Sequence, residues 1–194
     1  TATRRATGRS LFSIMLRNRT KDLKFEEAVM VAEPVTTEQA KHYMKIGFDD
    51  EDILIQNLIR SARELLEKQL NISITPKTIT ATFTHDGCFE YPIPYGPVGE
   101  VISAQFQYCE EETVTISTSN YKVLGSEFKM FKGTAGWWTL EYKAGYDYPP
   151  QPIRDGILKQ VAWMYENRGD VAGVGQVNPD VLYMLSVYNK NTWI

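Results

Sequence analysis

The spacing of apolar residues along the chain predicts three helices and a block of strands. From about Asp49 to Leu70 apolar residues recur every three or four positions, which is the period of an amphipathic helix. One seam of this helix should lie in a core, namely Ile55, Ile59, Ala62, Leu66 and Leu70. The side chains expected to face away from that core are Arg60, Arg63, Glu64, Glu67 and Lys68. Four consecutive acidic residues, 49–52, should cap the helix and fill its first turn.

Two further helices flank this pattern at a distance. Thr36 and Gln39 have capping-box spacing, so a short helix with Ala40, Tyr43 and Met44 inward should begin there and end before Gly47. Another should begin at Pro152 or Ile153 and place seven residues on one apolar side: Ile153, Ile157, Leu158, Val161, Ala162, Met164 and Tyr165. Trp163 falls opposite that side, near Lys159 and Glu166, so either the chain itself or a neighbouring subunit must cover it.

Between these helices, from Thr78 to Lys143, apolar and polar residues alternate with a period of two. Six or seven short strands follow, which indicates an antiparallel sheet or a small barrel. Gly133 to Gly136 lies between two such runs and reads as a hairpin turn, not a phosphate loop. The predicted fold class is therefore α+β: two N-terminal helices and one after the sheet form a bundle that packs with the small sheet or barrel, and both ends extend as arms.

The C-terminal stretch should end in a short helix capped by Asn178 and begun by Pro179. Its apolar seam continues toward the chain's last residues, and so much apolar surface requires a groove on this subunit or a partner: Val181, Leu182, Leu185, Tyr188 and Trp193. The expected organisation is a basic arm at 1–33, a core at 34–169, and a hinged helix with its tail at 170–194.

Charge is unevenly distributed along the chain. Residues 1–25 contain seven basic residues against one acidic residue, a net charge of +6, which leaves −9 for the rest because the whole chain carries −3. The arm should therefore meet an acidic partner or nucleic acid, or else be a solvated leader, and an acidic body should not hold DNA phosphates tightly. The arginines of the arm are its candidate contacts: Arg4, Arg5, Arg9, Arg17 and Arg19.

Catalytic and metal-binding patterns are not found in the sequence. The two histidines, His42 and His85, have no nucleophile or carboxylate context, and no phosphate-binding, dinucleotide or metal-ligand motif occurs. Cys88 and Cys109 are too far apart for a CxxC pair. No apolar run reaches membrane-spanning length. We therefore expect no enzyme activity, no cofactor and no membrane partner, and a chain made in a reducing cytoplasm.

The segment from Tyr142 to Arg168 resembles a pattern of one protein family. A strand ending in Tyr142-Lys-Ala-Gly145-Tyr, then Pro152-Ile153, then a helix closing in Trp163-Met-Tyr-Glu-Asn-Arg168 is similar to the head-tail connector (adaptor) proteins of tailed bacteriophages. The helix start at Thr36, the acidic start of the second helix and the β block agree in order. The family often has an arginine where Asn189 follows Tyr188, so an ionic contact at that position is not carried over.

The resemblance implies a structural protein of the virion neck, assembled in the host cytoplasm. It implies a ring of subunits, expected to be twelve, beneath the portal, with neighbouring adaptor subunits, the portal protein and a tail-side neck protein (stopper or tail terminator) as partners and with double-stranded DNA passing through. The C-terminal seam would then dock on the portal. Two further hypotheses come from the residues and not from the resemblance. Trp163, Lys159 and Glu166 could lie between subunits, and the arginines of the arm, which is not part of the family's usual core, could bind the portal, a neighbouring adaptor or a tail-side protein.

The alternative is a monomeric β-rich module that binds nucleic acid or a small ligand. Five aromatic residues of the β block could form a stacking platform for bases: Phe128, Phe131, Trp137, Trp138 and Tyr142. This alternative predicts a compact monomer with a saturable ligand, whereas an adaptor predicts rings or binding to the portal.

Overall fold

The computed structural model describes residues 20–27, 32–108, 113–168 and 176–189. The chain is an α+β protein, as predicted, and it divides into two compact units. The sheet unit comprises Thr1–Glu26, Thr78–Ile93 and Val98–Lys143, and the helical unit comprises Glu27–Lys77, Pro94–Pro97 and Ala144–Ile194. Each unit therefore combines segments that are far apart in the sequence.

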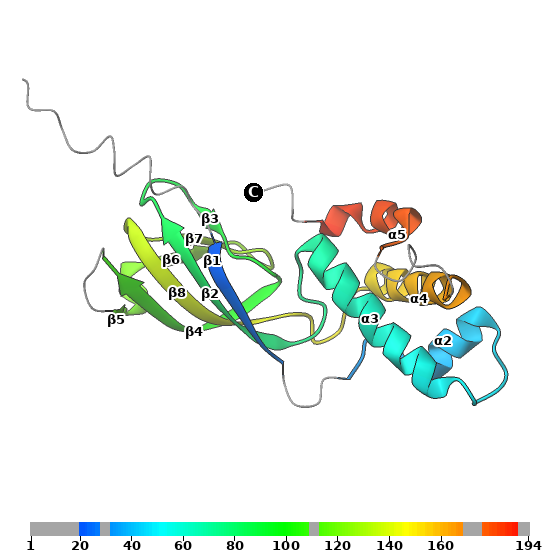
Figure 1. Cartoon of the computed structure of the whole chain (residues 1–194). Coiled ribbons are helices and arrows are strands. Elements are labelled where there is room, and N and C mark those ends of the chain that lie inside the picture. Colours follow the sequence, from blue (N-terminus) through cyan, green and yellow to red (C-terminus); the bar gives the residue numbers. More distant parts are fainter. Residues whose placement is uncertain (1–19, 28–31, 109–112, 169–175, 190–194) are drawn as a thin grey trace, which may run out of the picture. The chain divides into compact units, whose positions relative to one another are not determined.

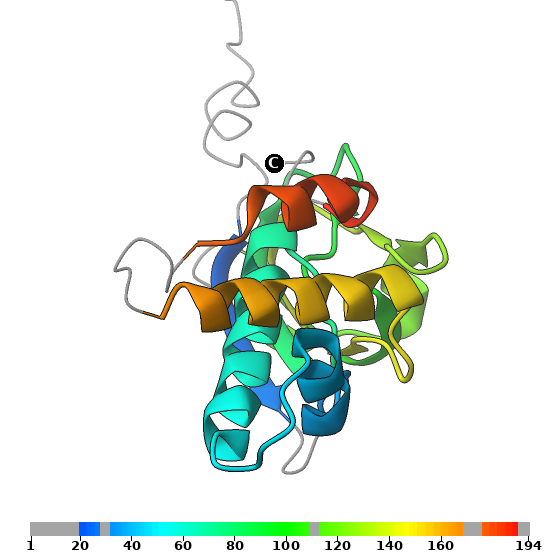
Figure 2. The ribbon, with the colours of Figure 1, turned by 90° about the vertical axis from the view of Figure 1, so that its right-hand side faces the viewer.

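The helical unit is built on three mutually packed helices, α2 (Thr37–Met44), α3 (Asp52–Leu70) and α4 (Gln151–Glu166). Figure 2 shows α4 crossing α3, with α5 (Pro179–Met184) running beside α4. A short 3-10 turn, η2 (Ser186–Tyr188), follows α5. The start of α5 is as predicted, because the Asn178 side chain accepts a hydrogen bond from the Asp180 amide at 2.9 Å.

The capping box predicted for α2 is present. The Gln39 amide donates to Thr36 Oγ1 at 3.2 Å, and the Thr36 amide donates to Gln39 Oε1 at 3.1 Å. Ala40 is buried, as predicted, but Tyr43 is 50% exposed, so its inward placement was wrong. α2 is only eight residues long, and a helix this short buries a narrow stripe.

The apolar seam of α3 is buried along its whole length: Ile59 is 2% exposed, and the other four residues are 0% exposed, namely Ile55, Ala62, Leu66 and Leu70. Two predictions for this helix were wrong. Arg63 and Glu67 were expected on the solvent side and are 4% and 5% exposed. The acidic run was expected to cap the helix and fill its first turn. Asp52 does lie in the first turn, but Glu51, at the N-cap position, makes no side-chain cap hydrogen bond. Tertiary partners take these charged groups instead.

The sheet unit contains two open antiparallel sheets (Figure 1). The larger follows the order β1-β2-β8-β4-β5 and the smaller the order β3-β7-β6, so the barrel alternative is not the one adopted. The strand bounds are β1 (Thr20–Glu27), β2 (Lys77–His85), β3 (Tyr91–Pro92), β4 (Val98–Gln107), β5 (Val114–Thr115), β6 (Lys122–Leu124), β7 (Met130–Lys132) and β8 (Gly136–Ala144), with a 3-10 turn, η1 (Thr118–Asn120), before β6.

Aromatic side chains from both sheets share one core. Phe83 of β2 stacks on Tyr91 of β3 with ring centroids 4.3 Å apart, and Phe131 of β7 meets Trp138 of β8 edge-on at 4.8 Å. Phe106 of β4 packs on the same Trp138 at 4.9 Å. Pairs of this kind add to the free energy gained by burying their area.

The hairpin predicted at Gly133 to Gly136 is not formed. β7 and β8 belong to different sheets, so the chain crosses from one sheet to the other here. A Cβ at Gly133 would lie 2.8 Å from the rings of both Phe131 and Trp138. Glycine lets the crossing pass close to the aromatic core.

Residues 20–27 of the predicted N-terminal arm form β1, an edge strand of the larger sheet. Among the described residues, no helix is both long and apolar enough to cross a membrane.

Candidate functional site

The turn after β8 can be built only with glycine. Gly145 has a φ of +107°, and its amide donates to the Pro97 carbonyl at 3.0 Å. A Cβ at this position would lie 2.1 Å from the Thr75 carbonyl oxygen. Because three chain segments meet here at backbone distance, the glycine of the Tyr142 to Gly145 pattern has a structural explanation.

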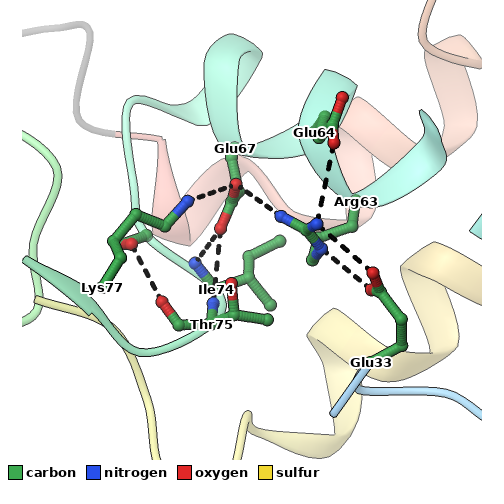
Figure 3. Close-up of polar contacts among 8 residues, drawn as sticks. Glu33, Arg63, Glu64, Glu67, Ile74, Thr75 and Lys77 are labelled. Atoms are coloured by element: carbon green, nitrogen blue, oxygen red, sulfur yellow. Dashed lines mark hydrogen bonds and ion pairs between the residues drawn. The ribbon is translucent and has the colours of Figure 1, made fainter. Parts of the chain in front are cut away.

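A buried carboxylate holds the C-terminal end of α3 (Figure 3). Glu67 accepts hydrogen bonds from the Ile74 amide at 2.7 Å, the Thr75 amide at 3.3 Å, the Lys77 ammonium at 2.8 Å and the Arg63 guanidinium at 3.1 Å. Two of these donors are backbone groups, so the carboxylate fixes the path by which the chain leaves the helix and enters β2.

Arg63 extends this cluster to the segment before α2. Its guanidinium donates to both oxygens of Glu33, at 2.8 and 3.3 Å, and the more exposed Glu64 lies 3.7 Å away. We call Glu33, Arg63, Glu67 and Lys77 the Glu67 cluster. Its two carboxylates balance two cations, which is the condition under which buried charges are tolerated.

A second carboxylate, Glu51, joins the start of α3 to the end of α4. It accepts hydrogen bonds from the Tyr165 hydroxyl and from Arg168 Nη1, the latter at 2.8 Å, and the Arg168 guanidinium lies 4.2 Å from the Tyr165 ring centroid. The hydrogen bonds from Tyr165 and Arg168 hold the pKa of Glu51 below its usual range, and the bond to Glu51 raises the pKa of Tyr165. Two residues of the Trp163 to Arg168 pattern thus act as a tertiary clamp.

Asp49 and Asp52 of the same run bind a lysine of α2. Lys41 lies 2.5 Å from Asp49 and 2.8 Å from Asp52, and hydrogen bonds to both carboxylates raise its pKa. Three acids of the run thus make contacts to α2 or to the end of α4. Within the described part of the chain, no group of three or more His, Cys, Asp or Glu side chains is arranged to hold a metal ion.

The face of α4 around Gly156 and Gln160 is covered by the chain's own C-terminal segment. The buried Gln160 amide donates to the Gln176 carbonyl at 3.0 Å and accepts from the Asn178 amide at 2.9 Å. A Cβ at Gly156 would lie 2.8 Å from Leu185 Cδ1. The Gln160 side chain and the absence of a Cβ at Gly156 thus allow the C-terminal segment to pack on α4.

Of the residues predicted to lie between subunits, Lys159 contacts the C-terminal segment. Lys159 forms an ion pair with Asp180 of α5 at 3.1 Å, Trp163 is half-buried, and Glu166 is exposed. The C-terminal segment from Gln176 to Leu185 accounts for cover at Gly156 and Gln160. A role of Lys159, Trp163 and Glu166 in subunit contacts stays a prediction.

The residues predicted to dock on the portal differ in burial. Val181 and Leu185 are fully buried in the helical unit, Leu182 and Tyr188 are half-buried, and Trp193 lies outside the described residues. The outer side of α5 and η2 instead presents Tyr183 at 86% and Val187 at 81% exposure. The buried residues hold the helix, and the exposed ones are available to a partner.

The aromatic platform proposed for a binding module is mostly inside the core. Phe131 and Tyr142 are 0% exposed and Trp138 is 1% exposed, so these three rings cannot stack on a base. Trp137 and Phe128 are half-buried. The alternation of strand residues explains the outcome, because successive side chains point to opposite faces.

The two histidines lie in different environments. His85 is fully buried, its Nδ1 accepts from the Gly87 amide at 2.9 Å, and burial lowers its pKa. His42 is exposed on α2. Within the described part of the chain, neither histidine is hydrogen-bonded to a serine, threonine or cysteine side chain.

Sequence reasoning missed the Glu67 cluster and Gln160. Arg63 and Glu67 are four residues apart on a helix, a spacing that equally suits a solvated surface pair, and no local signal distinguishes the two situations. The five arginines of the arm lie outside the described residues, so their contacts stay predictions.

The groups described above, namely Gly145, the Glu67 cluster, Glu51 and Gln160, hold chain segments and helices in place. A family model described as phage gp6-like head-tail connector protein matches residues 35–136. The chain belongs to this family of head-tail connector proteins. The match covers α2, α3 and most of the sheet unit, and it ends before the Tyr142 to Arg168 pattern.

Solved structures of similar fold come from gene transfer agent particles. One, titled "Neck of empty GTA particle computed with C6 symmetry", has a TM-score of 0.66 at 14% identity, and 87% of this chain and 95% of that chain are covered. Another, from "Virion of native gene transfer agent (GTA) particle", has a TM-score of 0.67 at the same identity and coverage. The comparison with curated proteins found no match.

Proposed function

We propose that this protein is the head-to-tail adaptor of a tailed bacteriophage, forming a ring beneath the portal that extends the DNA channel toward the tail. The observation that carries the proposal is the family match over residues 35–136, with a fold similar to chains from the neck and virion of gene transfer agent particles. A ring of twelve, assembled in the host cytoplasm and bound by a tail-side neck protein, is the form we propose.

The charge distribution supports a channel role. Residues 26–194 carry a net charge of −9, so DNA phosphates would meet no strong attraction on the body of the protein. A wall that held phosphates would slow DNA on its way out of the head. Double-stranded DNA is therefore a passing partner and not a specifically bound one.

Contact with the portal is assigned to the C-terminal segment. Tyr183 and Val187 are four residues apart and are the most exposed apolar residues of α5 and η2, while Val181 and Leu185 hold the segment on α4. Aromatic and aliphatic side chains presented in this way are typical anchors of protein interfaces.

The first test is particle mass, measured by light scattering after size exclusion with and without the portal of the same virus. A ring, alone or on the portal, is expected in place of the 22.2 kDa monomer. A monomer that ignores the portal would overturn the proposal.

The docking surface is tested separately by portal capture. Replacing Tyr183 and Val187 together by serine should lower capture at least tenfold, because two exposed anchors are lost without changing the buried seam. The matched control is Ser186→Ala, an exposed position in the same segment, which should leave capture unchanged. Full capture by the double variant would move the portal site elsewhere.

A further inference from the structure

β4 is an incompletely paired strand of the larger sheet. β5 pairs with Gln105 and Phe106, and the Ile116 amide donates to the Ala104 carbonyl at 2.9 Å. At the other end, the Val98 amide donates to the Glu127 carbonyl at 2.7 Å. Between these contacts, no described strand pairs with this side of β4 (Figure 1).

The open stretch presents backbone hydrogen-bonding groups. In an antiparallel sheet, alternate residues of a strand direct their amide and carbonyl groups to the same side. Since Ala104 faces β5, Glu100 and Ile102 face the unpaired side. Such an edge is a template for another strand.

Apolar side chains extend the core past this edge. Ile102 shares a face with Ala104, which is 2% exposed, and with Phe106, which packs on Trp138. Ile102 itself is 47% exposed, and Val114, opposite Phe106 in register, is 55% exposed. Edges are commonly protected by lysine, proline or charge. Here such groups lie at one end of the stretch, where the Lys129 ammonium donates to the Gly99 carbonyl and Glu100 pairs with Lys143, whereas the residues next to Ile102 carry no charge. Apolar side chains on the core-facing side of the sheet are therefore exposed to solvent at this edge.

We propose that residues 11–16 of a second copy of this chain, Leu-Phe-Ser-Ile-Met-Leu, add to this edge as a strand. Phe12, Ile14 and Leu16 fall on one side of an extended chain and would continue the apolar layer beside Ile102. Charge agrees, because residues 1–25 carry +6, whereas Thr78–Ile93 and Val98–Lys143 contain eight acidic and four basic residues, a net −4.

The length of the connection favours a second copy over the same chain. Leu16 is four residues before Thr20, where β1 begins, and four residues extend at most about 14 Å. From β1 to a strand placed beyond β4 the sheet order requires four steps of about 4.8 Å, or roughly 19 Å. The chain's own residues 11–16 therefore fall short of its own open edge.

A closed ring needs two different, complementary surfaces on each subunit. The leader continues from β1 at one end of the sheet, and the open part of β4 lies toward the other end. The inference rests on the proposed ring, for which it supplies the contact between neighbours.

The direct test is a disulfide between subunits, in a background with Cys88→Ser and Cys109→Ser. Protein carrying Ile14→Cys is mixed with protein carrying Ile102→Cys, oxidised and run on a non-reducing gel. A covalent dimer is expected. The matched control replaces the second protein by Gln105→Cys. The Gln105 side chain is exposed, but this residue of β4 is already paired with Thr115 of β5, so the control should give at least tenfold less dimer.

The same two cysteines on one chain distinguish the source of the strand. A ladder of covalent oligomers supports exchange between copies, whereas an internally bridged monomer, or no bridge at all, overturns the inference.

A second readout separates this inference from the proposed function. Ile14→Lys and Ile102→Lys should each weaken self-association at least tenfold, while Ser13→Lys and Gln105→Lys, which add the same charge away from the contact, should not. If wild-type protein assembles and captures the portal while all four variants assemble equally, the inference is overturned and the adaptor role stands. If wild-type protein neither assembles nor binds the portal, the adaptor role fails, and the disulfide result still decides whether the strand is exchanged.

Discussion

At the scale of single residues, backbone geometry and buried charge decide which side chains are indispensable. Gly145 and Glu67 both hold the segment around Thr75. Gly145 lets its own backbone approach the Thr75 carbonyl closely, and Glu67 accepts a hydrogen bond from the Thr75 amide. Neither position belongs to the apolar pattern, so a stability argument built only on hydrophobic burial would overlook both.

Gly145→Ala should destabilise the protein by about 2–4 kcal/mol or prevent folding, because a Cβ there meets the Thr75 carbonyl oxygen and a positive φ is strained for alanine. The measurement is urea unfolding. Gly47→Ala is the control, since a Cβ at Gly47 meets nothing within 4 Å, and its free energy of unfolding should be unchanged or slightly higher. Equal effects at the two glycines would contradict the explanation.

Glu67→Gln should lower the free energy of unfolding by about 3–5 kcal/mol, because it removes one charge from a buried, balanced set and leaves two cations facing one carboxylate. Glu64→Gln is the control: that side chain is 56% exposed and 3.7 Å from Arg63, so a change below about 1 kcal/mol is expected. A small effect at Glu67 would show that the cluster is not structurally important.

His85 should make stability depend on pH in the mildly acidic range. Burial depresses its pKa in the folded state, so its contribution is fully present above the ordinary value of 6.5 and is lost as the pH falls below it toward the folded value. The free energy of unfolding, measured from pH 7 to pH 5, should fall in wild-type protein. His42→Asn should keep this slope, because His42 is exposed, and His85→Gln should reduce it.

At the scale of elements, the Gln160 side-chain amide is one of the groups that position α5 on α4. A six-residue helix is too short to be stable alone, so its order comes from Gln160, Leu185 and the cap at Asn178. Gln160 links the two backbone groups that precede the helix and thereby sets where it starts.

Gln160→Met should release α5 from α4 while leaving α3 and α4 packed. It removes a donor and an acceptor and leaves the Gln176 carbonyl and Asn178 amide without this partner, at a cost of about 1–3 kcal/mol. Hydrogen exchange should speed up across residues 177–188 and remain slow in α3. Lys159→Met, which removes only an exposed ion pair with Asp180, should leave exchange nearly unchanged.

At the scale of the whole molecule, the separation of charge between the arm and the remainder decides how the protein meets DNA. Replacing Arg4, Arg5, Arg9, Arg17 and Arg19 by serine changes the net charge from −3 to −8. Retention of double-stranded DNA in low salt should fall at least tenfold, and both proteins should bind weakly at physiological salt. Fluorescence anisotropy across a salt series measures this. Tight, salt-insensitive binding by the variant would favour the binding-module alternative instead.

The sequence by itself determined the elements. Apolar periodicity, the Thr36 capping box and the Asn178-Pro179 start place α2, α3, α4 and α5 because these signals are local, and period-two alternation places the β block for the same reason. The resemblance carried by Tyr142 to Arg168 agreed with the family later matched over 35–136.

Only the tertiary structure decided which partners the charged residues have and how the chain passes between the two sheets. Arg63 and Glu67 are buried because Lys77, ten residues beyond Glu67, and Glu33, thirty residues before Arg63, balance their charges. The acidic run contacts Lys41 and Arg168 and forms no side-chain cap. The chain from β7 to β8 crosses between sheets because both flanking strands bury aromatics in one core. Local patterns determine where helices and strands form, whereas partners for buried charge and open edges depend on which segments meet in space.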